Sequence, residues 1–574
     1  MSAFGQRHRV LPLCLWLLAL PTTTTLAAQP GATSPGDQEL IRKRQDRLLD
    51  EQRRRLRDLQ ELPGKTPAAP PPITPPIDRC FQIHSIRLRG AEQVSATERQ
   101  ALLQPYVRQC LGVAHLNDLL KIITNHYIDR GLVTSRAYLP AQDLSSGQLQ
   151  IEVVEGRLEG LQGAPGSNLS HRELAMAFPG RTGEVLDLRE IEQLVDQLNR
   201  LPSNRAHMEL TPGTGIGSST VKVSNTSQKP WRASLSRNNS GQKSTGEQQW
   251  GLGLDWDSPL GLADQLNLRG NHDAQSDSAR GSDNATLNYN LPWGWWNFNY
   301  SYSQNHYQSV SRSAWGSFAY SGTSQSHQLQ AERVIHRDSL SKTSVSSGIA
   351  HMRAENYIGT AKQANNSPRI TEAQFGINHG RRLGGAFVNL DFGLQQGIGA
   401  LDAQSGRDPR PGQPTSRYRK YTATASYLRP LQLFGEAVTF TSLATGQRSE
   451  DVLYSAQRMS TGGQSSVRGF KDHYLSGDSG GYWRNELRWT RSVAWAWLRP
   501  AFAEYGASLA YDMGVISNTG YAGDQHGRVS GNAVELFARS QHAALSLTFA
   551  HSLERPAAIA DREAPIYLRM DFFL

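Results

Sequence analysis

The second half of the chain is dominated by short segments in which apolar or aromatic residues occupy every second position. Asn, Asp, Ser, Thr and Gly fill the positions between them, and Gly- and Ser-rich turns separate the segments. Clear examples are Trp250–Trp256, Ala285–Leu291, Trp296–Tyr302 and Val388–Leu394. A period of two places the two sets of side chains on opposite faces of a strand. From about Trp231 onward, the pattern therefore predicts a β-sheet with one apolar and one polar face.

Such a sheet suits a wall between lipid and water, because lipid-facing and lumen-facing residues alternate along every strand of a membrane barrel. A soluble β-sandwich alternates as well, so the pattern alone leaves both architectures open. The repetition of the pattern, the aromatic residues and an N-terminal export signal favour the membrane barrel. The last segment, Ile566–Leu574, alternates to its final residue.

The N-terminus has the features of a secretory signal. Arg7 and Arg9 form a basic start, residues 10–20 form an apolar core, and small residues lead to a cleavage point after Ala28. Residues 1–28 are therefore expected to be removed on export.

Two segments of contrasting character follow the signal. Residues 37–62 are dense in Arg, Gln, Glu, Asp and Leu and contain neither Gly nor Pro, which predicts a helix. Their leucines do not keep a heptad, so a coiled coil is not expected. Residues 63–78 are rich in proline and predict an extended linker.

Two smaller regions, residues 79–155 and 156–225, mix strand and helix patterns. In the first region, strand-like runs at 81–88, 133–139 and 148–154 surround two helical segments. In the second, Leu186–Leu201 has a helical apolar stripe, stops before Pro202 and is followed by strand-like runs. Both regions are predicted to fold as small α/β modules.

Composition narrows the class of protein. The 574 residues are only 38% hydrophobic, and beyond the N-terminus no uninterrupted apolar run is long enough for a membrane-spanning helix. Alternating barrel strands remain compatible with this composition. The net charge of +9 is spread along the chain without a basic stripe, so no nucleic-acid partner is expected. The histidines are scattered without metal-site spacing, and no metal or cofactor is predicted.

Two cysteines, Cys80 and Cys110, remain once the signal is removed. An exported chain meets an oxidising compartment, so the two are expected to form a disulfide. A metal site is the alternative, and two lone thiols without clustered histidines would make a poor one.

The sequence Val467-Arg468-Gly469-Phe470 places an arginine between apolar neighbours in a segment of small polar residues. Two alternating segments follow it, and they carry Glu486 and Asp512 on their polar faces. A loop arginine folded inward could bind one of these carboxylates through two charge-assisted hydrogen bonds. An isolated Arg-Gly pair is more often a solvated loop, so the residues alone do not decide.

The motif, preceded by two glycines and followed about forty residues later by Tyr-Asp-Met-Gly, resembles the signature of the outer-membrane transporters of two-partner secretion. These form the TpsB (ShlB/FhaC/HecB/CdiB) family of the BamA-like superfamily. The resemblance implies that Val467, Arg468, Gly469 and Phe470 lie at the tip of a loop inside the barrel. It further implies that Arg468 pairs with Asp512 on the barrel wall, with Glu486 as a second partner.

The rest of the chain fits the same resemblance. Residues 129–144 are similar to the first POTRA domain of these transporters, and Cys80 and Cys110 match its disulfide. The implied fold is an antiparallel transmembrane barrel of about 16 strands over residues 230–574, a plug helix at 37–62 and two POTRA domains. Leu574 departs from the phenylalanine that usually ends the family's last strand.

The resemblance also implies a function. The chain is expected to be a monomer in the outer membrane of a Gram-negative bacterium, inserted in the lipid by the barrel-assembly machinery, with its POTRA domains in the periplasm. It would export one large β-helical exoprotein of the TpsA type, whether a haemolysin, an adhesin or a contact-dependent inhibition toxin. No enzymatic activity is expected.

Three rival functions remain open. An insertase of the BamA type would share the barrel, and a passive pore would share its lumen. A secreted protease is the enzyme alternative, because Gly477–Gly481 reproduces the sequence around the nucleophile of trypsin-like proteases, with Ser479 as the serine. Gly241–Thr245 faintly resembles a phosphate loop but lacks the required upstream glycine.

Overall fold

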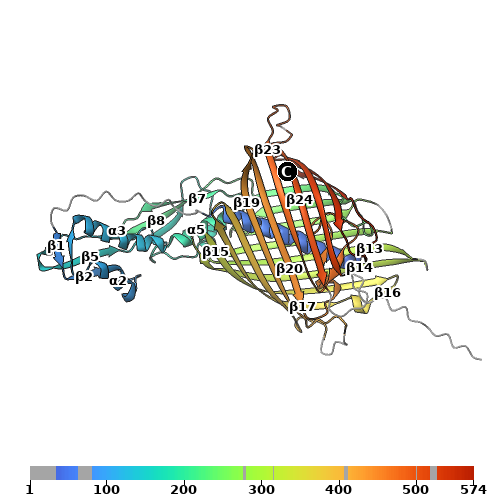
Figure 1. The fold of residues 1–574 in the computed structure, drawn as a ribbon, viewed down its shortest axis with the longest axis horizontal. Coiled ribbons are helices and arrows are strands. Elements are labelled where there is room, and N and C mark those ends of the chain that lie inside the picture. The colour runs from blue at the N-terminus through green and yellow to red at the C-terminus, as the bar shows by residue number, and fades with distance from the viewer. Residues whose placement is uncertain are drawn as a thin grey trace, which may run out of the picture.

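The structure is a computed structural model, and it describes residues 34–62, 80–275, 279–313, 316–405, 412–499, 501–517 and 526–574. The expected signal peptide (1–28) and proline-rich linker (63–78) lie outside the described residues. Two α/β modules extend from one end of a large barrel, and helix α1 lies inside that barrel (Figure 1).

The barrel is a closed antiparallel sheet of 16 strands, which confirms the predicted fold class. Its strands are β9 (Trp231–Asn238), β10 (Gln249–Asp257), β11 (Gln265–Asp273), β12 (Gly281–Trp293), β13 (Trp296–Ser313), β14 (Gly316–Arg337), β15 (Ser341–Ile358), β17 (Arg369–Leu383), β18 (Ala386–Ile398), β19 (Arg419–Leu433), β20 (Glu436–Ser449), β23 (Ser479–Ser492), β24 (Glu504–Ser517), β25 (Gly527–Arg539), β26 (Ala543–Glu554) and β27 (Ile566–Phe573). The two-residue β16 (Ala361–Lys362) pairs with the end of β15. Closure is made by β27, which pairs with β9 from Arg569 opposite Asn238 to Phe573 opposite Ser234.

The alternating sequence pattern separates the two faces of this wall. On β24, Leu509 and Val515 are exposed on the outside, whereas Asp512 between them is fully buried on the inside. Because the sheet is closed, each strand is hydrogen-bonded along both edges. The backbone N–H and C=O groups therefore have partners within the protein, as they must where hydrocarbon replaces water. In the described ranges, no helix combines the length and apolar character needed to span a membrane.

Helix α1 (Pro35–Gln60) begins two residues before the predicted segment and ends two residues before its end. The Ser34 hydroxyl caps it by accepting a hydrogen bond from the Asp37 N–H at 3.1 Å. Inside the barrel, its polar side chains meet the polar inner wall. Arg55 lies 3.2 Å from Glu332 on β14 and 3.7 Å from Asp391 on β18.

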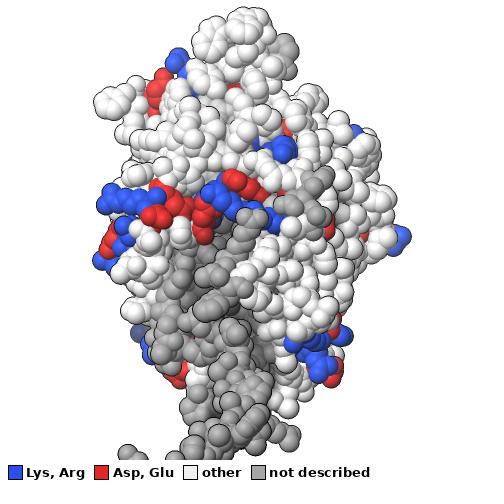
Figure 2. Space-filling model, turned by 90° about the vertical axis from the view of Figure 1, so that its right-hand side faces the viewer, with Lys and Arg blue, Asp and Glu red and all other residues white. Residues whose placement is uncertain are grey.

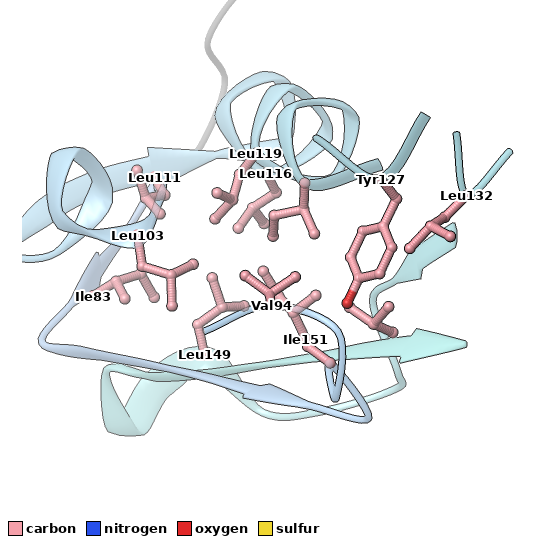
Figure 3. Packing of buried hydrophobic residues seen from close by; sticks show 13 residues of the cluster. Ile83, Val94, Leu103, Leu111, Leu116, Leu119, Tyr127, Leu132, Leu149 and Ile151 are labelled. Atoms are coloured by element: carbon pink, nitrogen blue, oxygen red, sulfur yellow. The ribbon is translucent and has the colours of Figure 1, made fainter. Parts of the chain in front are cut away.

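The first module has the elements β1 (Cys80–Ile83), β2 (Ser85–Arg89), α2 (Ala96–Leu103), β3 (Gln109–Gly112), α3 (Val113–Asp129), β4 (Arg136–Tyr138), β5 (Gln148–Val154) and short 3₁₀ turns at Gln104–Tyr106 and Leu144–Ser146. Leu116, Leu119, Ile123 and Tyr127 of α3 pack over Leu149 and Ile151 of β5 (Figure 3). The predicted run 81–88 is divided in two, because the backbones of His84 and Ser85 both donate to the Gly147 carbonyl. The short strand β3 was not predicted.

The second module has the elements β6 (Arg157–Gly163), α4 (His171–Ala177), α5 (Leu188–Asn199), β7 (Ala206–Pro212) and β8 (Ser218–Asn225). The apolar face of α5, including Ile191, Leu194 and Leu198, packs over Val221 and Val223 of β8. Its sheet has the order β6-β8-β7, so β7 is an outer strand.

The polar side of α5 fixes this module to the barrel. The Arg337 guanidinium at the end of β14 contacts Asp196 and lies 3.2 Å from Glu192. The side-chain amides of Gln193 and Gln197 both donate to the Gly294 carbonyl in the β12–β13 turn, at 3.2 and 3.1 Å. The module therefore holds several neighbouring turns at one end of the barrel.

Cys80 and Cys110 are disulfide-bonded and tie β1 to β3 in the first module. The bond closes a loop with a sequence separation of 30 residues. Replacing both cysteines by serine should destabilise this module by about 3–4 kcal/mol, because the unfolded chain regains loop entropy. Pulse proteolysis of the full-length protein in urea measures the change, and equal urea midpoints for variant and parent would contradict it.

Candidate functional site

A long loop between β20 and β23, residues 450–478, folds back into the barrel. Two short strands, β21 (Met459–Thr461) and β22 (Leu475–Gly477), pair with each other and form its stem. Val467, Arg468 and Phe470 at its tip are all at most 5% exposed. The loop belongs to the end of the barrel opposite the α/β modules, because alternate connections of an antiparallel barrel lie at the same end.

Arg468 uses its guanidinium and its backbone to bind the wall of the barrel. Its Nε and Nη2 donate to the two carboxylate oxygens of Asp512 at 2.7 and 2.8 Å, and its backbone N–H donates to Asp512 at 3.0 Å. Its Nη1 donates to Glu486 on β23 at 2.8 Å. The side chains of Arg468 and Asp512 are 6% and 0% exposed. The three residues singled out in the sequence therefore form one buried, hydrogen-bonded ion cluster.

The residues beside Arg468 fit the motif to the wall. A Cβ on Gly469 would lie 2.6 Å from the His551 carbonyl oxygen and 3.0 Å from the Gly531 Cα, so only glycine permits this close approach. Phe470 and Val467 pack with Ile516 and Val529 of the wall. The motif therefore combines an apolar anchor, an ionic anchor and a backbone contact.

The last strand also holds the motif. The Tyr567 hydroxyl on β27 lies 3.1 Å from the Arg468 carbonyl and 3.3 Å from the Phe470 carbonyl. Glu563, just before β27, accepts hydrogen bonds from the backbone N–H groups of Lys471, Asp472 and His473 at 2.7, 3.0 and 2.8 Å. Sequence reasoning missed both residues, since nothing in their local patterns connects them to a loop about ninety residues away.

Further ion pairs join the loops at this end of the barrel. Lys243 in the β9–β10 loop lies 2.7 Å from Asp472, and Lys471 contacts Glu247. Figure 2, which looks onto this end, shows basic and acidic side chains side by side across the face. The loop is thus tied to its neighbours on both the wall and the rim.

Helix α1 touches the same loop from the inside. The Arg44 guanidinium and the Gln45 amide donate to the carbonyls of Ala456 and Ser460, both at 2.7 Å. The hydroxyl of Ser465 contacts Asp46. The helix and the loop therefore fill the lumen together, and a movement of one must break contacts with the other.

A cavity of about 390 Å³ remains between α1 and the wall. Most of the residues that line it are of polar type, among them Glu332, Glu372 and Lys420. Within the described residues, no group of three or more His, Cys, Asp or Glu is arranged to hold a metal ion. The space is a polar lumen narrowed by the helix and the loop.

The protease-like segment Gly477–Gly481 forms the base of the loop. Asp478 is fully buried, lies 3.3 Å from Arg458 and accepts the Leu453 N–H at 3.0 Å. The Ser479 hydroxyl donates to the Ser449 carbonyl at 3.1 Å and accepts the Ser449 N–H at 3.0 Å. These contacts give Asp478 and Ser479 a structural role in closing the loop.

A closed membrane barrel whose lumen holds a helix and an arginine-tipped loop, with two α/β modules at one end, defines an outer-membrane transporter of the two-partner secretion class. Residues 217–538 match the family model described as "Haemolysin secretion/activation protein ShlB/FhaC/HecB". Residues 81–156 match the ShlB-type POTRA domain, and 157–212 match a POTRA domain. The chain belongs to the ShlB/FhaC/HecB family of haemolysin secretion/activation proteins.

Relatives and solved structures agree with this assignment. The outer membrane transporter CdiB of Dickeya dadantii is 31% identical, over 96% of both chains. The hemolysin transporter protein ShlB of Serratia marcescens is 29% identical, over 88% of this chain and 90% of its own. The structure of CdiB from Escherichia coli superimposes with a TM-score of 0.89 at 33% identity, covering 94% of this chain and 99% of that one. The predicted family, transporter function and outer-membrane location, with periplasmic POTRA domains, are confirmed.

Replacing Arg468 by Ala should free the loop from the wall, because the buried Asp512 carboxylate would lose its guanidinium partner at a cost of about 3–5 kcal/mol. Limited proteolysis of the folded barrel in detergent should then cut within residues 450–478. Arg528→Ala is the control, since Arg528 lies 3.6 Å from Glu554 in an exposed pair. A loop as resistant in Arg468→Ala as in the control would contradict the role of the cluster.

Deleting residues 38–62 should enlarge the conducting lumen, because these residues include most of α1, which lies inside the barrel. In planar bilayers, the deleted protein is expected to show larger and more frequent current steps than the parent. Arg55→Ala, which removes the ion pairs to Glu332 and Asp391, should increase the frequency of the steps without changing their size. Identical currents from all three proteins would show that the helix does not limit conduction.

Proposed function

We propose that this transporter secretes one large exoprotein partner, and that the loop cluster of Arg468, Asp512 and Glu486 holds the export channel in its resting state. The observation that carries the proposal is the buried contact of Arg468 with Asp512, at 2.7 and 2.8 Å, inside a lumen that α1 also occupies. A channel filled in this way is closed to a polypeptide until both elements move.

The partner is proposed to enter from the periplasmic end as an extended chain. Strands β4 and β7 are outer strands of the two POTRA sheets, so their free edges can accept a further strand. Tyr138 at the end of β4 and the adjoining Leu139 are both exposed and offer apolar contacts beside that edge. Main-chain pairing would supply affinity, and these side chains would supply specificity.

The second POTRA domain has an exposed apolar side chain that the partner could contact. Ile216 is 98% exposed at the tip of the β7–β8 hairpin. Hydrogen bonds from the Ser218 hydroxyl and from the backbone of Thr214 and Gly215 hold Glu159 under this hairpin and lower its pKa to about 2. These hydrogen bonds hold the base of the hairpin that carries Ile216.

The protein is proposed to act as a monomer and without catalysis. Ser479 is engaged on both sides by the backbone of Ser449, which leaves the protease alternative without an available nucleophile. The relatives are named as transporters. Folding of the partner outside the cell would give transport its direction without a nucleotide.

Secretion of the protein encoded beside this gene tests the proposal. Arg468→Ala should lower the amount of partner in the medium by about tenfold or more. The loop in the lumen then loses an ion pair whose removal costs about 3–5 kcal/mol. Heat-modifiable migration on gels should show that the barrel is still folded. Arg528→Ala is the matched control and should secrete normally, because Arg528 forms an exposed pair with Glu554.

Normal secretion by Arg468→Ala would overturn the role of the cluster. Deletion of the whole protein distinguishes the insertase alternative, since many outer-membrane proteins would then decline together. A partner that still reaches the medium in the deletion strain would reject the exporter itself.

A further inference from the structure

The C-terminal half of helix α1 is bound to the barrel wall along a single stripe. Gln52, Leu56 and Leu59 are at most 5% exposed, and the side chain of Arg55 is 13% exposed. In chain order these four residues are spaced i, i+3, i+4 and i+7, so they lie on one face of the helix. The side chains on its other faces are exposed, namely those of Arg53, Arg54, Arg57 and Asp58. This half of the helix therefore has one binding face, and the wall has the matching surface.

The Gln52 amide is bound by wall side chains from two neighbouring strands. Its Nε2 donates to Asp391 of β18 at 2.7 Å. Its oxygen accepts hydrogen bonds from the Asn389 amide at 3.1 Å and from the Ser426 hydroxyl of β19 at 2.8 Å. The wall therefore recognises both the donor and the acceptor of this side chain.

Arg55 joins two carboxylates of the wall. Its guanidinium donates to Glu332 of β14 at 3.2 and 3.4 Å, and its Nε lies 3.7 Å from Asp391. Within the described parts of the chain, no other Lys or Arg forms an ion pair with either carboxylate. Both carboxylates therefore lose their cation when α1 leaves the lumen.

An apolar pocket adjoins these carboxylates. Leu56 and Leu59 pack with Phe387 of β18, and Leu428 of β19 packs against the same cluster. A Cβ on Gly380 would lie 2.7 Å from Cδ2 of Leu59, so the glycine leaves the space that this leucine occupies. The wall thus places an apolar pocket beside an acidic pair.

The acidic pair is held in position by the wall itself. Asp391 accepts hydrogen bonds from the amides of Asn378 and Asn389, both at 2.8 Å. Glu332 accepts a hydrogen bond from the Ser344 hydroxyl at 2.5 Å. All of these residues belong to paired strands of the barrel, so the site keeps its shape when the helix leaves. The polypeptide in transit is then the chain that lies beside it.

We propose that this wall site binds the exoprotein as it passes, an inference that rests on the proposed function and specifies which segments the lumen recognises. The ligand is a segment that becomes helical at the site, with Arg or Lys followed by an apolar residue and by a second apolar residue three positions later. Amphipathic helices bind grooves through anchors at such spacings. Helix α1 is the resting occupant, and segments of the exoprotein replace it. The site consists of Glu332, Phe387, Asn389, Asp391, Ser426 and Leu428.

The test uses the full-length protein in cells, with the photo-crosslinker p-benzoylphenylalanine placed at Phe387. Without the exoprotein, illumination should join position 387 to α1. In cells that secrete the exoprotein encoded beside this gene, part of the adduct should move to the exoprotein. Mass spectrometry should then find the basic and apolar pattern of the ligand in the crosslinked segments. The same crosslinker at Asn267, on the inner face of β11, reports passage of the exoprotein elsewhere in the lumen.

A double variant removes the charges of the site while leaving the barrel closed. Glu332→Gln with Asp391→Asn should lower the exoprotein adduct at position 387 about tenfold and leave the adduct at position 267 unchanged. Asp255→Asn is the matched control, because Asp255 is a wall carboxylate that pairs with Arg269 of the wall. Heat-modifiable migration checks that each variant is folded.

Two results would overturn the inference and leave export by this protein intact. One is a secreted exoprotein that gives an adduct at position 267 and none at position 387. The other is an adduct at position 387 that is equally strong in the double variant and whose segments share no pattern. A parent strain that does not secrete the exoprotein would instead overturn the proposed function, and this inference with it.

Discussion

The buried ion cluster of Arg468 with Asp512 and Glu486 is the constraint on which the arrangement of the lumen depends. The Asp512 carboxylate and the Arg468 guanidinium are removed from water, and the Glu486 side chain is partly buried beside them. Such burial is tolerated only when the hydrogen bonds are complete. Asp512 accepts three hydrogen bonds from Arg468 alone. The loop is therefore held at one place on the wall, and the contacts of α1, Tyr567 and Glu563 are built around it.

Much of this fold could be predicted from local pattern. Alternation located the strands, because each residue of a membrane wall must suit either lipid or water. The same alternation placed Asp512 on the inner face opposite Leu509, and helix composition located α1 to within two residues. These features depend on residues that are close in the sequence, so they can be predicted from the sequence alone.

What could not be predicted depends on closure of the sheet. Tyr567 reaches the loop only because β27 returns to pair with β9 and brings the last strand beside residues 468–470. The four-residue strand β3 is too short to show a period, and it exists because it pairs with β1 next to the disulfide. The contacts of α1 in the lumen could not be predicted either, because the sequence of a polar helix does not indicate which residues of the wall it binds.

The polar character of α1 has a consequence for how the channel can open. Its contacts with the wall and the loop are mainly hydrogen bonds and ion pairs. Small apolar clusters join them where Leu56 and Leu59 meet Phe387 and where Leu40 packs beside Met352 and Leu453. Each such hydrogen bond contributes only about 0.5–1.5 kcal/mol net, because water replaces it when the contact breaks. The helix can therefore leave the lumen by losing these contacts one at a time, with water replacing each of them. A polypeptide that enters the lumen then needs no single large input of free energy to displace the helix.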